Sequence, residues 1–436
     1  MRTAQGIVWA GAAVAALVAG CSTSSEPGST ETTGAGKQVV VTDARAADDV
    51  VAATWELGVA ALRAGDGPNV VVSPSSLVSA LAMYSEGAVK TEAAPFDAAL
   101  GATGQDRTDA VSYLSAALAR YDGDPAAVQA AKLPATPVVH TAQRVVLDDN
   151  PEHAPAQTFL DRLQRGYGAG VLVTDLGSDK GTAALSSWVN EHTGGLVKET
   201  AITPNPTLVA VLQDAVAFAG AWQQPFDPNS TDDADFAAAV PGSTDLTTVQ
   251  VPTMHAELSV AVVQADGWTA VRLAYTDDLS ADLLLPPSRE SCPPGDCPVW
   301  TETDPTMYQA PVLAGLSAAL DNAPLVKVDL AVPTLDLKTT TDLMSLLTDL
   351  GIAGEGLTGV RADSEPVVLA QAVQQAVLKV DEDGTRAAAV TELAMGEGAA
   401  PPQEVLEIAF DRPFLFVVRD GTTGWPVFLA SITDPR

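Results

Sequence analysis

The chain has 436 residues, of which 47% are hydrophobic, so it is long enough to bury a large core. It carries 23 Lys and Arg against 55 Asp and Glu, which gives a formal net charge of −32 at pH 7. A charge of that sign repels nucleic acid and anionic membrane surfaces, so neither is expected as an electrostatic partner.

The N-terminus has the layout of an export signal. Arg2 precedes an apolar run from Ile7 to Ala19, which is too short for a membrane-spanning helix of about twenty residues. The segment from Leu17 to Cys21 resembles a bacterial lipobox, which implies cleavage before Cys21 and lipid attachment there. The protein is then expected on the outer face of the bacterial cell membrane and partly secreted; a plain secretory signal with an incidental cysteine is the alternative. Residues 22–38 are rich in Ser, Thr and Gly and predict a flexible tether.

The folded part is predicted to begin near Val39. Apolar residues at helical spacing predict helices over 51–62, 77–84, 110–121, around 160–163, around Trp188 and over 341–351. Short runs rich in β-branched and apolar residues predict strands over 70–72, 138–147, 208–218, 251–255, 271–286, 326–337, 376–380 and 414–418. No internal repeat or second linker divides this part of the sequence.

The last two predicted strands are separated by about thirty residues rich in Ala, Gly and Glu. A segment of that length without a core pattern is typical of a functional or mobile loop. Its first part is unusual for a loop, because a period of two places Thr385, Ala387, Ala389 and Thr391 on one uncharged face. Side chains this small could enter a packed sheet at little steric cost.

Two motifs at the ends of this loop resemble those of one protein family. The segment from Asp381 to Thr391 resembles the hinge of an inhibitory serpin, and the segment from Phe410 to Phe416 resembles the motif that follows the serpin reactive loop. Further similar segments occur at 69–83, 185–198 and 220–228, so that the resemblance covers about Val39 to Pro435. It implies an α+β fold with a large, mostly antiparallel central sheet, further sheets, surrounding helices and an exposed reactive loop. The expected layout is a lipoprotein signal over 1–21, a tether over 22–38 and a serpin domain over 39–436.

The resemblance also assigns site residues. The hinge would comprise Glu382, Gly384, Thr385, Ala387, Ala388, Ala389 and Thr391. The "shutter", where the main sheet parts, would comprise Ser73, Ser76, Asp214 and Gln374, and the "breach", where the loop first enters the sheet, would contain Trp222. A helix cap is the alternative role for Ser76, and an ordinary core position is the alternative for Trp222.

Two shutter positions depart from the family pattern, which usually has Asn at the position of Asp214 and His at that of Gln374. An amide can donate to a carboxylate, so one hydrogen bond between these two residues is expected to survive. If buried, Asp214 needs further donors.

The resemblance implies inhibition of serine proteases by a suicide-substrate mechanism. A protease would cut the loop and form an acyl-enzyme, and the segment from Gly384 onward would then insert into the main sheet and distort the linked protease. The family's spacing places the cut at Gly398-Ala399, within a window that also includes Met395, Gly396, Glu397 and Ala400. No Lys or Arg lies between Arg386 and Arg412, so elastase-like or subtilisin-like targets are favoured over trypsin-like ones, and Glu397 leaves a glutamate-specific protease open.

Counting back from Phe410 gives a later cut, near Pro402, so the loop is longer than usual. Extra length could slow insertion past deacylation. The alternative function is therefore a non-inhibitory serpin that acts as a binding or scaffold protein on the cell surface. In either case we expect a monomer that is not an enzyme and needs no cofactor.

Cys292 and Cys297 lie in a turn-rich segment and are expected to form a disulfide in an oxidising compartment, with two free thiols as the alternative.

Metal-binding and catalytic motifs are weak. The segment from Lys379 to Val390 superficially resembles a calcium loop but lacks carboxylates at its first and twelfth positions. His140, His153, His192 and His255 have no zinc-like spacing, and no nucleophile elbow or phosphate loop occurs. We expect no metal site. A catalytic triad that the fold assembles from distant residues leaves no sequence pattern, so the absence of a motif does not exclude one.

Overall fold

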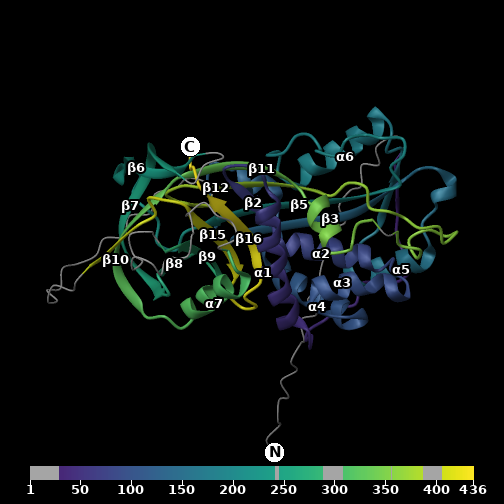
Figure 1. Cartoon of the computed structure of the whole chain (residues 1–436), viewed down its shortest axis with the longest axis horizontal. Coiled ribbons are helices and arrows are strands. Elements are labelled where there is room, and N and C mark those ends of the chain that lie inside the picture. Colours follow the sequence, from purple (N-terminus) through teal and green to yellow (C-terminus); the bar gives the residue numbers. More distant parts are fainter. Residues whose placement is uncertain (1–28, 241–244, 288–307, 355, 386–404) are drawn as a thin grey trace, which may run out of the picture.

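The computed structural model describes residues 29–240, 245–287, 308–354, 356–385 and 405–436 (Figure 1). Its α-helices are α1 (Ala47–Ala64), α2 (Pro74–Ser85), α3 (Ala94–Leu100), α4 (Gly104–Leu118), α5 (Gln157–Tyr167), α6 (Asp179–His192), α7 (Ala310–Leu320) and α8 (Met344–Asp349). The first eight strands are β1 (Thr30–Thr32), β2 (Val70–Val72), β3 (Val138–Asp148), β4 (Val171–Thr174), β5 (Ala210–Ala221), β6 (Thr231–Ala239), β7 (Leu246–Ala265) and β8 (Trp268–Ala274). The others are β9 (Leu279–Leu285), β10 (Leu325–Pro333), β11 (Leu335–Asp342), β12 (Val373–Val380), β13 (Gly384–Thr385), β14 (Leu406–Ala409), β15 (Phe414–Asp420) and β16 (Pro426–Ile432).

The described strands form three hydrogen-bonded sheets. A nine-stranded sheet has the order β14-β10-β7-β8-β9-β15-β16-β2, with β6 paired to β7. A five-stranded sheet has the order β1-β4-β3-β5-β13, and a separate pair is made by β11 and β12. Helices and mostly antiparallel strands are mixed along the chain, so the predicted α+β class with several sheets is confirmed.

The core lies where α1 and α2 cover the C-terminal strands. Every residue of β15 and of β16 is buried, because these apolar runs have a packing partner on both faces. On α1 the predicted apolar side has Trp55, Val59 and Leu62 buried, while Val51 is only partly buried. Trp425 completes the contact by donating its indole N–H to Thr54 Oγ1 at 2.9 Å.

The five-stranded sheet has a helix on each face. Figure 1 shows α6 on one side of β3 and β5 and α2 on the other, and both helices contact these strands. Hydrogen bonds tie α6 to the sheet, since Gln213 Nε2 donates to Leu185 O at 3.0 Å and Arg144 Nη2 donates to Ala184 O at 3.2 Å. Any rearrangement of β5 must therefore take place between two packed helices.

The predicted flexible tether over 22–38 is wrong for part of its length. Thr30–Thr32 form β1, which pairs antiparallel with β4. Ser/Thr-rich composition gives no core pattern, but the exposed edge of β4 supplies backbone partners that composition does not reveal. The helix predicted over 341–351 is also shorter, because Thr341 and Asp342 pair with β12 and α8 begins only at Met344.

Among the described residues, no helix combines the length and the low polarity that a membrane crossing requires.

Candidate functional site

The main sheet is divided between β5 and β12. These strands run side by side and parallel, and the one bridge between them within the described residues joins Leu212 to Ala372. C-terminal to that bridge, the described residues of β5 and β12 form no hydrogen-bonded ladder with each other. We call the facing edges of the two strands, Gln213–Ala219 and Val373–Val380, the seam.

The upper end of the seam is already occupied by the start of the predicted hinge. Asp381 and Gly384 form a hairpin, with Asp381 N–H donating to Gly384 O at 2.9 Å. Gly384 then pairs with Ala221 and Thr385 with Gly220, both antiparallel. A Cβ atom at Gly384 would lie 2.1 Å from the carbonyl oxygen of Gly220, so this close approach requires glycine.

The resemblance implied an exposed reactive loop from Gly384 to Phe410, and this is wrong for Gly384 and Thr385 at its start and for Phe410 at its end. Thr385 is 2% exposed, because it enters β13 before any cleavage. At the other end Leu406–Ala409 pair with β10 as β14, but Leu406, Glu407 and Ala409 stay exposed as expected. Ile408 is buried, and Phe410 is buried against Phe414. Backbone pairing and aromatic burial hold these residues in sheets.

The predicted breach residue Trp222 holds the hairpin. Its indole N–H donates to Asp381 O at 3.0 Å, and its backbone N–H donates to Asp383 O at 2.8 Å. Its ring stacks on Tyr275 with centroids 4.5 Å apart, and the Tyr275 hydroxyl is 2.5 Å from Thr385 Oγ1. Trp222 is also 4% exposed, so it is at once a core residue and a contact of the hinge.

Tyr275→Phe is expected to destabilise the uncleaved protein by about 1–3 kcal/mol, because it leaves the buried Thr385 hydroxyl without its partner. Thr385→Val should cost a similar amount. The double variant should recover most of the loss, since replacing both partners by apolar groups is nearly neutral. Denaturant midpoints of the four proteins measure this cycle, and additive losses would contradict a direct bond.

The hairpin carries three consecutive acidic residues. Burial, together with the charges of Asp383 and Glu382, raises the pKa of Asp381 to about 6, although backbone hydrogen bonds from Asp383 and Gly384 act in the opposite direction. Glu382 accepts a hydrogen bond from Thr231 Oγ1 at 2.6 Å. The predicted hinge residue Glu382 is thus fixed to the start of β6.

The four predicted shutter residues meet beneath the lower part of the seam. Gln374 Nε2 donates to Asp214 Oδ2 at 2.9 Å, so the hydrogen bond expected between them is present. Gln374 also holds the backbone of Ser73, accepting from its N–H at 2.8 Å and donating to its C=O at 3.1 Å. The contact of Gln374 with Asp214 is a side-chain link across strands that share no backbone ladder here.

Ser76 is not the helix cap that was considered for it. It lies inside the first turn of α2, and Ser73 occupies the N-cap position. The Ser76 hydroxyl instead bonds the carboxyl of Asp214 and accepts from Gln143 Nε2 at 3.1 Å. Ser73 Oγ donates to Val427 O at 2.8 Å, which joins this group to β16.

Asp214 has the donors that its position requires. Burial raises its pKa from 3.8 to about 6, although hydrogen bonds from Ser76, Gln374 and Gln143 act in the opposite direction. Gln143 was not predicted as a site residue. It lies directly opposite Asp214 in the β3–β5 ladder, a position that becomes visible only once the register is known.

A histidine pair was also missed. His140 Nε2 lies 2.8 Å from His192 Nδ1, and His140 Nδ1 lies 2.8 Å from Asp122 Oδ1. Burial, followed by the charges of His140 and Arg144, lowers the pKa of His192 to about 4. The pair joins the end of α6 to β3, which agrees with a structural role for both histidines.

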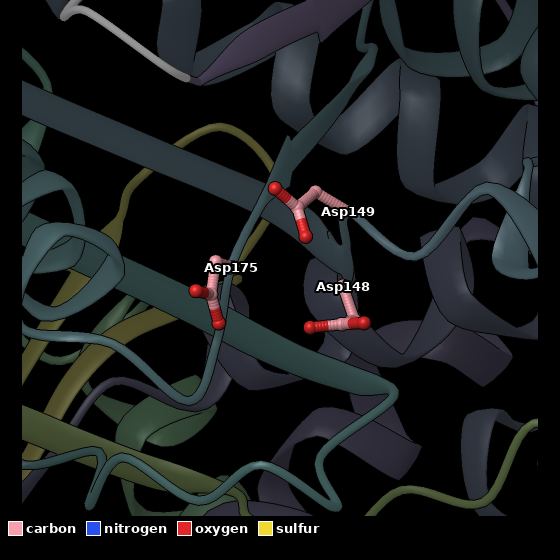
Figure 2. A group of neighbouring side chains, drawn as sticks. All are labelled: Asp148, Asp149 and Asp175. Atoms are coloured by element: carbon pink, nitrogen blue, oxygen red, sulfur yellow. The ribbon is translucent and has the colours of Figure 1, made fainter.

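Three carboxylates gather where β3 and β4 end. Oxygen atoms of Asp148, Asp149 and Asp175 lie within 4.8 Å of one another (Figure 2). Asp148 accepts from the N–H groups of Asn150 at 3.1 Å and Leu176 at 3.3 Å, and Asp175 accepts from Gly177 N–H at 3.0 Å. These bonds fix the side chains of Asp148 and Asp175 to the two turns.

Several predicted residues lie outside the described part of the chain. They are the lipidation residue Cys21, the predicted disulfide pair Cys292 and Cys297, the hinge residues Ala387, Ala388, Ala389 and Thr391, and the whole cleavage window from Met395 to Ala400.

The seam between β5 and β12, with Gly384 and Thr385 paired at its upper end, is consistent with the family that the chain matches. A family model described as serpin (serine protease inhibitor) matches residues 55–435. The chain belongs to the serpin family. Serpins are protease inhibitors rather than enzymes, which agrees with the prediction that this chain is not an enzyme.

Individual serpins show how far the similarity extends. The chain is 29% identical to mouse alpha-1-antitrypsin 1-1 over 287 residues, which cover 64% of each protein. The native state of tengpin, a thermophilic serpin, superimposes with a TM-score of 0.71 over 93% of this chain and 97% of tengpin at 19% identity. Human kallistatin gives 0.69 over 89% of this chain and 97% of kallistatin at 20% identity. The two structures support the serpin fold.

Proposed function

We propose that this serpin inhibits serine proteases by presenting its loop as a substrate and inserting the cut segment into the seam between β5 and β12. The observation that carries the proposal is β13, which occupies the upper end of the seam, antiparallel to β5 and bridged to Asp381, the residue that follows β12. An inserted strand would only have to continue it.

The pairings of Gly384 with Ala221 and with Asp381 agree on where an inserted strand would run. Gly384 lies opposite Ala221 on one side and Asp381 on the other. In an antiparallel strand that continues from Gly384, Leu393 is nine residues further on. It would lie opposite the residues nine positions before those partners, which are Leu212 and Ala372. Those two residues are the pair that the bridge joins in the uncleaved protein. The register on both sides therefore gives residues 386–392 consistent pairing partners once β5 and β12 separate, and this result is independent of any resemblance.

The same register matches side chains to the site. Thr391 would fall opposite both Asp214 and Gln374, on the face where Thr385 already lies. Its hydroxyl could replace the direct bond between those two residues, and the alanines at 387 and 389 would fill the space between them and Thr385. The small uncharged face predicted for the loop thus suits this seam.

The chemistry follows from the order of events. The protease serine attacks a carbonyl in the loop, releases the segment beyond the cut and remains linked to the loop as an ester. Insertion of the segment from Arg386 onward would carry the linked protease to the far end of the seam before water hydrolyses the ester. Small and apolar residues over 395–400, with no cation, favour an elastase-like or subtilisin-like target.

We also propose that the protein is a lipoprotein of the outer face of the bacterial cell membrane, based on the lipobox-like segment that ends at Cys21. Cys21→Ser should move the protein from the membrane fraction to the medium. Retention of the variant in the membrane fraction would refute the anchor.

Incubation with a panel of serine proteases tests the proposal. We expect an SDS-stable complex with an elastase-like or subtilisin-like enzyme and release of a C-terminal fragment that begins within 395–400. Thr385→Arg is the matched variant, because an arginine has no room beneath Tyr275 and its burial is unfavourable. It should be cleaved at the same bond without forming the complex. Cleavage of the natural chain without any complex would instead favour the non-inhibitory alternative, a binding or scaffold protein on the cell surface.

A further inference from the structure

A small cavity lies at the lower end of the seam, on the face of the sheet that α6 covers. Gln213 of β5 and Val373 of β12 line it from the two sides of the seam, and Trp188 of α6 lines it as well. Ala201 and Ile202, from the connection between α6 and β5, complete this part of the lining. The cavity is therefore bounded by both strands, by the helix and by the connection.

The connection is held to β12 by amide side chains. Ala201 N–H donates to Gln375 Oε1 at 3.1 Å, and Gln375 Nε2 donates to the carbonyl oxygen of Glu199 at 3.3 Å. Thr203 N–H donates to Gln371 Oε1 at 2.9 Å, and its carbonyl oxygen accepts from Gln371 Nε2 at 2.8 Å. These four bonds keep the connection over this end of the seam and limit the access of water. A charged group placed in the cavity therefore needs a partner of opposite charge.

A positive charge lies next to the cavity. The guanidinium carbon of Arg144 is 4.7 Å from the centre of the Trp188 ring. Arg144 Nε and Nη2 donate to Gln213 Oε1 at 2.8 and 2.6 Å, so one neutral oxygen receives both donors. Asp214 also lines the cavity, but its carboxylate accepts from Gln374 on the opposite face of the sheet. A carboxylate entering the cavity would be a stronger acceptor for Arg144 than the amide oxygen is.

The register of an inserted strand brings a carboxylate to this cavity. In the antiparallel pairing that continues from Gly384, position 392 falls opposite both Gln213 and Val373. The residue at that position is Glu392. Because neighbouring residues of a strand point to opposite faces, its side chain would lie on the side of α6 when that of Thr391 lies on the other side.

We propose that the cavity binds the side chain of Glu392 after cleavage of the loop, and that Arg144 pairs with its carboxylate. This inference rests on the proposed function, because Glu392 reaches the cavity only as part of an inserted strand. Arg144 would then be two strands away, with Cα atoms about 10 Å apart. The two long side chains together span that distance across Gln213. The pair stabilises the inserted form and makes an acidic residue at position 392 a determinant of the stability of the cleaved protein.

Glu392→Gln and Glu392→Lys in the full chain test the pair. Before cleavage both variants should melt at the temperature of the natural chain, because the pair forms only afterwards. After cleavage within 395–400, Glu392→Gln should melt about 3 °C below the nicked natural chain. Glu392→Lys should melt lower still, because it brings a second positive charge to Arg144. Glu407→Gln, at an exposed position of β14, is the matched control and should change neither temperature.

A cycle with Arg144→Gln separates the pair from other effects of residue 392. Its readout is the gain in melting temperature on cleavage, because Arg144 also has contacts in the uncleaved protein. In the Arg144→Gln background, Glu392→Gln should increase this gain, since it removes a buried carboxylate that has lost its cation. If Arg144→Gln does not fold, the order of the three nicked proteins that differ at residue 392 decides.

Equal melting of those three nicked proteins, or the same effect of Glu392→Gln in both backgrounds, would overturn the pair. The failure of the inference can be told from that of the proposed function. If cleavage gives the natural chain no gain in melting temperature, the proposed insertion itself fails. A normal gain that residue 392 does not affect refutes the pairing with Arg144 alone.

Discussion

Cleavage of the loop within residues 395–400 is expected to raise the melting temperature of the protein by about 10 °C or more. The seam leaves the facing backbone groups of β5 and β12 without a shared ladder between the Leu212–Ala372 bridge and β13. An inserted strand over residues 386–392 would satisfy these groups on both sides, at about 1 kcal/mol net for each hydrogen bond. Thermal unfolding of intact and nicked samples, followed by circular dichroism, measures the difference.

Thr385→Arg serves as the control for this measurement. Because the arginine blocks entry of the strand at its first buried position, the nicked variant should melt close to the temperature of its own intact form. A nicked natural chain that melts no higher than the intact chain would show that the seam does not accept the loop, and inhibition by insertion would be excluded.

Asp214→Asn is expected to stabilise the uncleaved protein at neutral pH and to lose this effect in acid. The folded protein raises the pKa of Asp214 from 3.8 to about 6. Because the folded-state value is the higher one, the contribution of this group to stability is complete below pH 3.8 and is lost as the pH rises through about 6. The full shift in the pKa of Asp214 corresponds to about 3 kcal/mol. Because Asp214 keeps some contact with solvent, we expect Asp214→Asn to raise the free energy of unfolding by nearer to about 1 kcal/mol.

Denaturation midpoints at about pH 8 and about pH 4 test the sign, with the variant more stable only at the higher pH. Asp233→Asn, on the exposed face of β6, is the matched control and should change neither value. The pKa of Asp381 is also raised to about 6, so the pH curve of the natural chain contains both groups and only the difference between the two chains isolates Asp214. A variant that is less stable than the natural chain at about pH 8, and no less stable at about pH 4, would show that the charged form is the better partner for Gln374.

Local pattern and motif predicted the parts of the site that lie within one segment. The apolar run before Asp381 predicted a strand, and the uncharged alternation from Thr385 predicted a face that could enter a packed sheet. The hairpin that already seats Gly384 and Thr385 in the sheet was not predicted. The bond between Gln374 and Asp214 also followed from donor and acceptor chemistry once both positions were assigned to one place.

What sequence could not predict depends on the partners that the fold supplies. Thr30–Thr32 have no apolar alternation, and they form a strand because the edge of β4 is available to them. His140 and His192 are 52 positions apart and meet only because α6 lies across β3. Exposure of the loop at Gly384 and Thr385 was expected from the family resemblance, whereas the aromatic contacts of Trp222 and Tyr275 hold these residues in the sheet.

The seating of Thr385 against Gly220 has a consequence for speed. Formation of a β-ladder is slowest at its first pairs, which restrict the chain before many bonds reward it. In this protein those pairs exist before the protease arrives, so what remains after cleavage is elongation of an existing nucleus. The extra loop length that the family's spacing predicts would lie beyond the point where growth begins, so under the proposed mechanism it would not delay the first step of insertion.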